Sequence, residues 1–338
     1  MSTQEFSPDS IRGSPHRRVM DYPRKLEHGI MFHHFHNGEH PKGQGSISKE
    51  DFENILNFVG VDRILSPREW LKKLEANELD KQHLCITFDD ALFCQFEIAL
   101  PILEAYNLKA FWFVYSSVFE GHVGRIEIYR FFRSKYFQNI DDFYELFFKK
   151  IFASEFSERA KTILKGEEEI ANLLKMFPFY SINDVKFRLI RDRALTIKNY
   201  EAIMDQMILE YGLDLLDMSK VLWMSNDHLQ YLNNSDHVVG LHSYSHPTVL
   251  ADLSYEEQLE EYVKNYRHIK ENCRDSPVAM AHPCNSYNGD TLKILEHLGI
   301  RCAFRSNMFP KYEGGRLNPN RFEIARQDHA NIMRMLGR

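Results

Sequence analysis

The stretch His83-Leu-Cys-Ile-Thr-Phe-Asp89-Asp90 joins a short apolar run to two adjacent carboxylates. Apolar runs of strand-forming residues are typical of strands that are buried on both faces, in a parallel sheet covered by helices. In α/β proteins the chemistry lies at the carboxyl ends of such strands. Adjacent carboxylates also repel each other, so a cation, a proton or a basic partner must offset the second charge. The alternative is a solvated strand end at which Asp90 caps the next helix, and this stretch alone favours neither interpretation.

The same pattern recurs along the chain, with predicted helices between the predicted strands. Ser48 and Ser254 each precede an acidic residue by three positions, which is the capping pattern that begins a helix. Strand, helix and strand follow one another from residue 83 to residue 115, as in a right-handed βαβ unit. Further buried strands are predicted at 29–33, 237–241, 277–281 and 301–304. The sequence therefore predicts an α/β fold.

Residues 122–220 differ from the rest because they are rich in Phe, Lys and Glu and show apolar residues at helical spacing. We predict a helical insertion here that shapes the substrate site and separates two parts of the α/β core, 27–121 and 221–338. Its aromatic residues are expected to form a small core of their own rather than a ligand site. Residues 1–26 are polar and are predicted to be a mobile tail.

Composition excludes several classes of protein. The 338 residues carry a net charge of −6, and no basic block marks a nucleic-acid-binding surface. No apolar stretch approaches a membrane span, and the N-terminal region resembles neither a signal nor a transit peptide. The five cysteines form no CxxC pair, which is typical of a reducing compartment. A cytoplasmic protein is therefore expected, with no nucleic-acid partner; an oligomer is compatible with the sequence, which does not fix one.

Two histidines follow the predicted strand 237–241 directly, in His242-Ser-Tyr-Ser-His246-Pro247. If this segment forms one helical turn, both imidazoles face the same way. The spacing alone is weak evidence, since His36 and His40 show it in a segment that reads as a polar loop. With a carboxylate from the other strand end, the pair would supply three ligands to a divalent cation such as zinc. Three protein ligands leave one position open, which is the catalytic arrangement.

These residues carry a family resemblance. Thr87-Phe-Asp-Asp90, His242-Ser-Tyr-Ser-His246-Pro247 and Ala281-His-Pro-Cys-Asn-Ser-Tyr-Asn288 resemble the successive motifs of the polysaccharide deacetylase family, also known as the NodB-homology domain or carbohydrate esterase family four. The resemblance covers about residues 28–120 and 222–330. It implies a distorted (β/α) barrel of about seven strands, interrupted by the helical insertion.

The resemblance also implies roles for individual residues. Asp90, His242 and His246 would hold one divalent metal ion, most simply Zn²⁺, with Co²⁺ or Ni²⁺ as alternatives, and Asp89 would be the catalytic base. In many members an Arg precedes the third-motif Pro and pairs with the base; His282 stands at that position here. Two further candidates are Pro283 and Cys284 in the third motif, where the backbone N–H of Cys284 would help to bind an oxyanion. The remaining candidates are His329, as the general acid, and His36, at the barrel mouth.

The implied activity is hydrolytic removal of an N-acyl group, above all acetyl, from an amino sugar. The substrate would be a glycan or a glycan precursor, such as a sugar nucleotide or a lipid-linked glycan in surface-polysaccharide biosynthesis. One alternative is a catalytically silent family member that binds a glycan or a protein, which the altered third motif favours. Another is a metal-dependent hydrolase of a non-sugar amide.

Overall fold

The computed structural model describes residues 22–176 and 180–338. Most of the predicted tail, 1–26, therefore lies outside the described residues. Tyr22 is buried, and its hydroxyl is 2.7 Å from Nε2 of His28. Among the described residues, no helix is long and apolar enough to cross a membrane.

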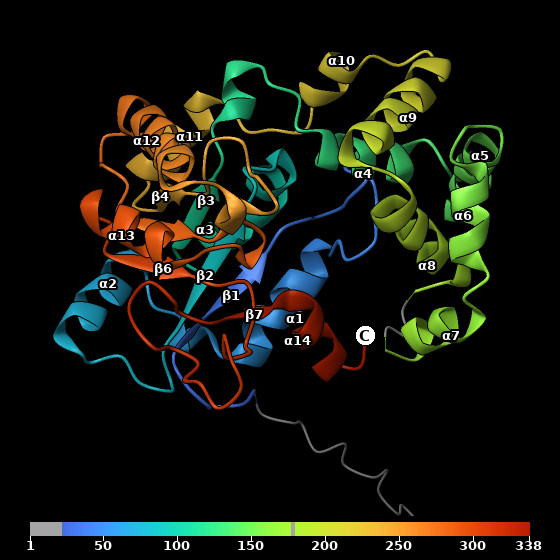
Figure 1. The fold of residues 1–338 in the computed structure, drawn as a ribbon. Helices are drawn as coiled ribbons and strands as arrows, with labels where there is room; N and C mark the ends of the chain where they lie inside the picture. Colours follow the sequence, from blue (N-terminus) through green and yellow to red (C-terminus); the bar gives the residue numbers. More distant parts are fainter. Residues whose placement is uncertain (1–21, 177–179) are drawn as a thin grey trace, which may run out of the picture.

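The described residues contain one sheet of seven parallel strands, in the order β6-β5-β4-β3-β2-β1-β7. Residues just before β7 close most of the remaining gap, because Ile324 bridges to Phe304 of β6. The result is a nearly closed barrel (Figure 1), so the predicted distorted (β/α) barrel of about seven strands is confirmed. The strands are β1 (His28–Phe32), β2 (Leu84–Asp89), β3 (Ala110–Val114), β4 (Val238–Leu241), β5 (Ala279–Ala281), β6 (Cys302–Phe304) and β7 (Arg326–Asp328).

Strand alternation separates the inside of the barrel from its outside. Phe88 points outward and stacks on Trp112 with 4.2 Å between the ring centroids, within the core between strands and helices. Cys85 belongs to a second cluster, with alternate residues of β3, β5 and β6, that fills the barrel. Since side chains alternate along a strand, Asp89 shares the inward face of Cys85. Because the strands are parallel, their last residues all lie at the same end of the barrel, which we call its mouth.

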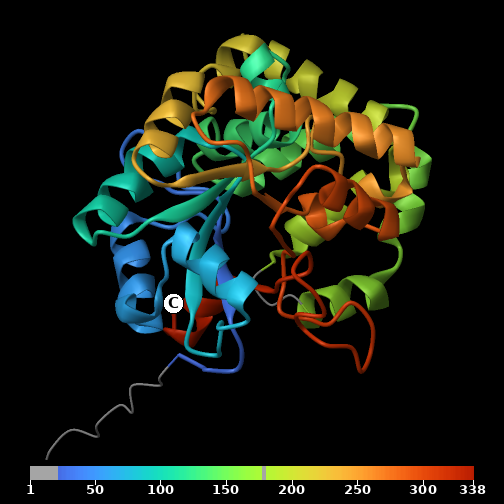
Figure 2. The same ribbon diagram turned by 90° about the vertical axis from the view of Figure 1, so that its left-hand side faces the viewer.

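Helices cover the outside of the barrel, and the turned view shows the long orange helix α12 running across the strands (Figure 2). Ser48 and Ser254 begin α1 and α12 with capping boxes, as predicted. A π-helical segment, Gln95–Ala99, precedes α3. The helices are α1 (Lys49–Val59), α2 (Pro67–Ala76), α3 (Leu100–Ala105), α11 (Asn226–Asn234), α12 (Tyr255–Asn272), α13 (Gly289–His297) and α14 (His329–Met335).

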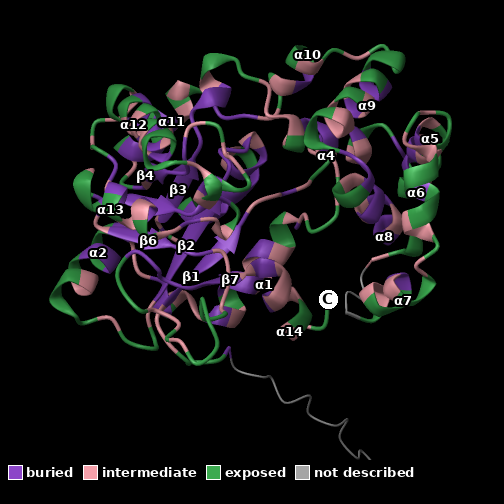
Figure 3. Cartoon of the chain, in the orientation of Figure 1, coloured by how far each residue is buried: buried purple, intermediate pink, exposed green. Residues whose placement is uncertain are grey.

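Between β3 and β4 the chain forms a separate group of helices beside the barrel (Figure 1). Their inward faces build a core of their own from residues such as Phe132, Phe143 and Phe147, and the same helices show buried and exposed sides in Figure 3. The helices are α4 (Arg125–Lys135), α5 (Ile140–Phe152), α6 (Ser157–Leu164), α7 (Glu167–Met176), α8 (Ile182–Leu189), α9 (Ile197–Glu210) and α10 (Leu215–Ser219).

Candidate active site

Asp89 is held at the end of β2 by a buried arginine from β7. Arg326 donates Nη1–H to Asp89 Oδ1 and Nη2–H to Oδ2, both at 2.7 Å. It also donates to the Arg305 carbonyl at 2.6 Å and to the Thr87 hydroxyl at 3.1 Å. Burial raises the pKa of Asp89, but the charges of Arg326 and His242 more than offset this and lower its pKa below the usual range. Asp89 is therefore an ionised carboxylate.

This pair answers a question that the sequence left open. The third motif lacks the arginine that pairs with the base in many relatives, so the sequence did not identify a partner for Asp89. The structure supplies the guanidinium from a different strand, in the segment Arg326-Gln-Asp-His329. His282 instead donates its Nε2–H to the Phe322 carbonyl, 2.8 Å away, and its ring stacks on Tyr287. Burial lowers the pKa of His282 to about 3, so this ring is neutral.

Asp90 reaches the same mouth because the chain turns sharply after β2. An extended strand would send Asp90 to the face opposite that of Asp89. Asp90 and Ala91 instead have φ values of 76° and 55°, the left-handed region that Asp tolerates better than most residues. Burial raises the pKa of Asp90, but its contacts with His242, His246 and His33 lower it overall.

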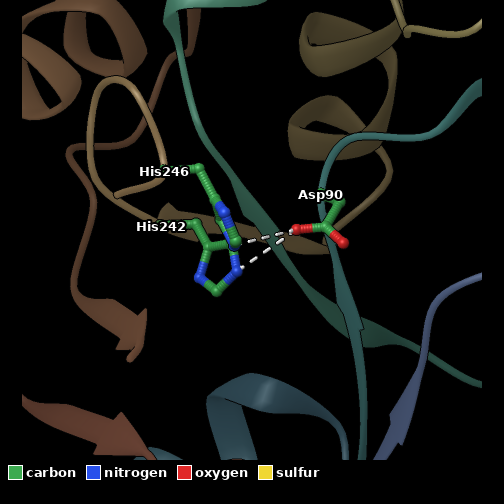
Figure 4. Close-up of side chains that lie close together, drawn as sticks. All are labelled: Asp90, His242 and His246. Atoms are coloured by element: carbon green, nitrogen blue, oxygen red, sulfur yellow. Dashed lines mark ion pairs between the residues drawn. The ribbon is translucent and has the colours of Figure 1, made fainter. Parts of the chain in front are cut away.

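The two predicted histidines converge on one oxygen of Asp90. Nε2 of His242 and Nε2 of His246 both lie 3.4 Å from Asp90 Oδ1, as the dashed lines in Figure 4 show. His242 Nδ1 is 2.8 Å from the Ala281 carbonyl, so it carries the proton and Nε2 presents its lone pair. The ligand atoms of these three residues all lie within 4.8 Å of one another.

A loop, not a helical turn, brings the histidines together. The predicted helical turn over 242–246 is absent, because Ser243 and His246 have positive φ values of 64° and 57°. Two residues of α12 fix the loop instead. Asn265 Oδ1 accepts from the His242 N–H at 2.9 Å. Glu261 accepts from the backbone N–H groups of Tyr244 and Ser245 at 3.0 and 2.8 Å.

His33 belongs to the cluster although the sequence analysis did not select it. It follows β1 directly, and its Nε2 lies 3.7 Å from Asp89 Oδ2 and 3.8 Å from Asp90 Oδ2. The signal was available, because His33 stands directly after a buried strand as Asp90 and His242 do. The adjacent His34 turns the other way and is 2.6 Å from the half-buried carboxylate of Glu127.

Pro283 and Cys284 lie at the mouth after β5. Cys284 and Asn285 have left-handed φ values of 49° and 58°, which bend the backbone at the strand end. The thiol of Cys284 is close enough to sense both aspartates. Burial of the thiol, followed by the charges of Asp90 and Asp89, raises its pKa to about 11, although the residue as a whole is exposed. The thiol therefore stays protonated near neutral pH.

The structure places His36 and His329 apart from this cluster. His36 Nδ1 is 3.0 Å from the Ser46 hydroxyl. His329 is buried at the start of α14, where Nε2 is 2.9 Å from the Gly45 carbonyl and the ring stacks on Phe32. Within the described part of the chain, no hydrogen bond or ion pair joins either imidazole to Asp89 or Asp90.

A pocket of about 490 Å³ opens beside the cluster. Asp90 and His246 form its barrel side, with Tyr115 from the end of β3. The opposite side comes from the helical group between β3 and β4, through residues of α4 and α9 that include Ile126 and Ile197. Segments far apart in the sequence therefore enclose one space next to the Asp–His–His cluster.

Two features of the cluster suit a divalent metal ion: its set of ligand groups, and a buried oxygen atom that has no hydrogen-bond partner. Asp90 Oδ1 is buried and has no hydrogen-bond partner among the described residues, yet two imidazole nitrogens face it. Burying a carboxylate oxygen that has no hydrogen-bond partner destabilises the folded protein. Two imidazoles and one carboxylate are a ligand set typical of catalytic zinc and of related cations. The residues present therefore fit a metal ion.

The chain is similar to known polysaccharide deacetylases in part of its sequence and in its fold. A family model described as polysaccharide deacetylase matches residues 198–303, about a third of the chain, including His242, His246 and Cys284 but neither aspartate. No curated protein sequence gives a significant match. The deacetylase PplD from Streptococcus pyogenes, solved in complex with acetate, has a similar fold, with a TM-score of 0.53 at 15% identity over 92% of this chain and 97% of that one. A de-N-acetylase from Aggregatibacter actinomycetemcomitans gives a TM-score of 0.51 at 12% identity, over 92% and 99% of the two chains.

The predicted resemblance to the polysaccharide deacetylase family is thereby confirmed: the family model matches the second part of the barrel, and solved structures of such enzymes share the fold.

Proposed function

We propose that this protein is a metal-dependent hydrolase that removes an N-acyl group, in the first place acetyl, from an amino sugar of a glycan or glycan precursor. The observation that carries the proposal is the convergence of Asp90, His242 and His246 beside an ionised Asp89, at the mouth of the barrel. A solely structural role would not call for the arginine-paired carboxylate next to the three ligand groups.

A divalent cation in such a site supplies a Lewis acid that polarises an amide carbonyl and makes water more acidic. Asp89 would accept a proton from the attacking water. Both of its oxygens accept from Arg326, but each retains a further lone pair. The backbone N–H of Cys284, at the turn after β5, would help to hold the oxyanion that develops on the carbonyl.

The leaving amine needs a proton donor, and we propose His33 for this role. Among the described residues, it is the imidazole within 4 Å of both aspartates that does not belong to the proposed ligand set. His329 contacts the Gly45 carbonyl and His36 contacts the Ser46 hydroxyl, so geometry favours His33 over both.

The helical group between β3 and β4 would select the substrate. Its helices α4 and α9 line the pocket that contains Asp90 and His246, so a sugar bound there would touch both parts of the chain. The two exposed isoleucines, Ile126 and Ile197, offer apolar surface to one face of a sugar ring, while Glu201 and Arg125 offer hydrogen bonds.

The first test is metal content together with activity on a panel of N-acetylated amino sugars. The wild-type protein should hold about one equivalent of a divalent metal, and Asp90→Ala and His242→Ala should lose it. Asp89→Asn and His33→Gln should keep the metal and lose turnover by about 10²- to 10⁴-fold. His83→Gln, which changes an imidazole on a distant loop, is the matched control. Full turnover by Asp89→Asn, or no metal uptake from zinc, cobalt or nickel, would overturn the proposal; turnover of cyclic amides alone would reassign the substrate.

A further inference from the structure

A second pocket, of about 660 Å³, lies between the loop before α1 and the helical group. Its lining is strongly basic, with a single carboxylate, Asp184, among the charged side chains of the wall. The cationic residues that line it are Lys42, Arg130, Arg133, Arg188 and Arg191. We call it the basic pocket.

Only part of this positive charge is neutralised by the protein. Arg188 pairs with Asp184 at 3.1 Å, and Arg191 pairs with Asp192 at 2.6 Å. Within the described residues, no ion pair is made by the three other cations of the pocket. The Nε of Arg133 is buried and has no hydrogen-bond partner there. These three cations are Lys42, Arg130 and Arg133.

Packing on aromatic rings explains the position of some of these side chains but not their charge. The guanidinium of Arg133 lies 5.7 Å from the ring centroid of Phe143 and 5.4 Å from that of Phe187. A cation over an aromatic face is a common structural arrangement. It leaves the mutual repulsion of Arg130 and Arg133 in place, since these residues lie three apart on one face of α4. An anion in the pocket would remove that repulsion.

The basic pocket adjoins the candidate active site along α4. Glu127 lines the pocket that contains Asp90 and His246, and Arg130 and Ser134 line the basic pocket. These residues fall on one helix face, and the seven steps from Glu127 to Ser134 span about 10 Å along the helix axis. Gln44 ties the loop to the helical group, because its side chain contacts both Asp184 and Arg188 and its carbonyl accepts from Arg130.

We propose that the basic pocket binds the phosphate or diphosphate of a phosphate-linked amino-sugar substrate, whose N-acyl group lies at the Asp–His–His cluster. Guanidinium groups and lysine are the usual partners of phosphate oxygens. The pocket is large enough for a diphosphate, and its distance along α4 suits a ligand that spans both sites. The substrate assignment rests on the function proposed above, whereas the anion site itself does not.

The test is calorimetric titration of the metal-loaded protein with inorganic diphosphate. Wild-type protein and Asp90→Asn should bind it equally, because the pocket contains no metal ligand. Lys42→Gln/Arg133→Gln should bind at least about tenfold more weakly, since it removes two charged contacts. Lys149→Gln/Arg159→Gln, which removes the same charge from exposed positions outside the pocket, should bind as the wild type does. Because Arg133 packs on two rings, the exposed Lys42→Gln alone and Arg133→Lys are measured as well; the first should weaken binding and the second should largely retain it.

Equal binding by the wild type and the Lys42→Gln/Arg133→Gln variant, or loss of binding only in Asp90→Asn, would overturn the proposal. Uridine diphosphate and farnesyl diphosphate are titrated in parallel, and the tighter of the two identifies a nucleotide or a prenyl carrier. The two proposals fail separately. Diphosphate binding without hydrolysis of any N-acyl sugar refutes the function alone, and hydrolysis without diphosphate binding refutes the basic pocket alone.

Discussion

Replacement of Arg326 by methionine should destabilise the fold far more than loss of an ordinary surface charge. Arg326 is fully buried and makes four hydrogen bonds, two of them to Asp89. Methionine has similar length and fills much of the space, but it leaves the carboxylate of Asp89 buried without its partner. Breaking one side of a buried ion pair costs about 3–5 kcal/mol. We expect a decrease of this size in the free energy of unfolding of Arg326→Met.

Urea unfolding at neutral pH measures this decrease. Arg338→Met is the control, because Arg338 makes a single exposed ion pair with Asp51 and should cost at most about 1 kcal/mol. Asp89→Asn added to Arg326→Met removes the orphaned charge and should restore part of the stability, as a double-mutant cycle would show. Equal losses for Arg326→Met and Arg338→Met, or no recovery in the double variant, would refute the view that this pair is tightly coupled.

Three further predictions concern other parts of the molecule. Burial lowers the pKa of His237 to about 3, and its Nδ1 accepts a hydrogen bond from the Ala110 N–H. In the unfolded chain this imidazole binds a proton near pH 6.5, whereas in the folded protein it stays neutral at that pH. The free energy of unfolding should therefore fall as the pH drops below about 6.5. Between pH 7 and pH 5, the free energy of unfolding measured in urea should fall by about 1–2 kcal/mol less for His237→Asn than for the wild type. Equal pH dependence of the two proteins would contradict the view that His237 is buried in its neutral form. Glu261→Gln should loosen the loop 242–246 and weaken metal binding about 10- to 100-fold in chelator competition; unchanged affinity would show that the loop needs no such clamp. Ser254→Ala should lower the free energy of unfolding by about 1 kcal/mol by removing the cap of α12, whereas a change within error would mean that tertiary packing alone holds this helix end.

The cluster of Asp90, His242 and His246 was predictable because of how parallel sheets are built. Each residue follows a buried strand that is visible as an apolar run, and the carboxyl ends of such strands lie at one mouth. The backbone geometry that completes the site was not predictable. Positive φ values at Ser243 and His246 replace the expected helical turn, and the positive φ of Asp90 turns the chain after β2. None of these positions carries the glycine that would mark a left-handed residue.

Arg326 and His33 show two different limits of the sequence. The strand β7 has no apolar run, since it reads Arg-Gln-Asp, and it pairs with β1 almost 300 residues away in the chain. Local pattern cannot reveal such a pairing, so the partner of Asp89 was sought in the third motif. His33 is one of four histidines between residues 33 and 40. Its position directly after β1 was the one sequence signal that set it apart, and the register of β1 beside β2 places it next to both aspartates.

The position of β7 in the chain determines when the barrel can be completed during synthesis. Among the described residues, the core of the helical group is built from residues 123–222, which leave the ribosome before the last strands of the barrel. Strand β1 pairs with β2 but lacks its second neighbour, β7, and Asp89 lacks the guanidinium of Arg326, until residues 326–328 emerge. During synthesis a buried carboxylate would have no partner, which disfavours early closure of the barrel. Completion of the barrel mouth therefore waits for residues 326–328, and a chain interrupted before residue 326 should contain the folded helical group but not the Asp89–Arg326 pair.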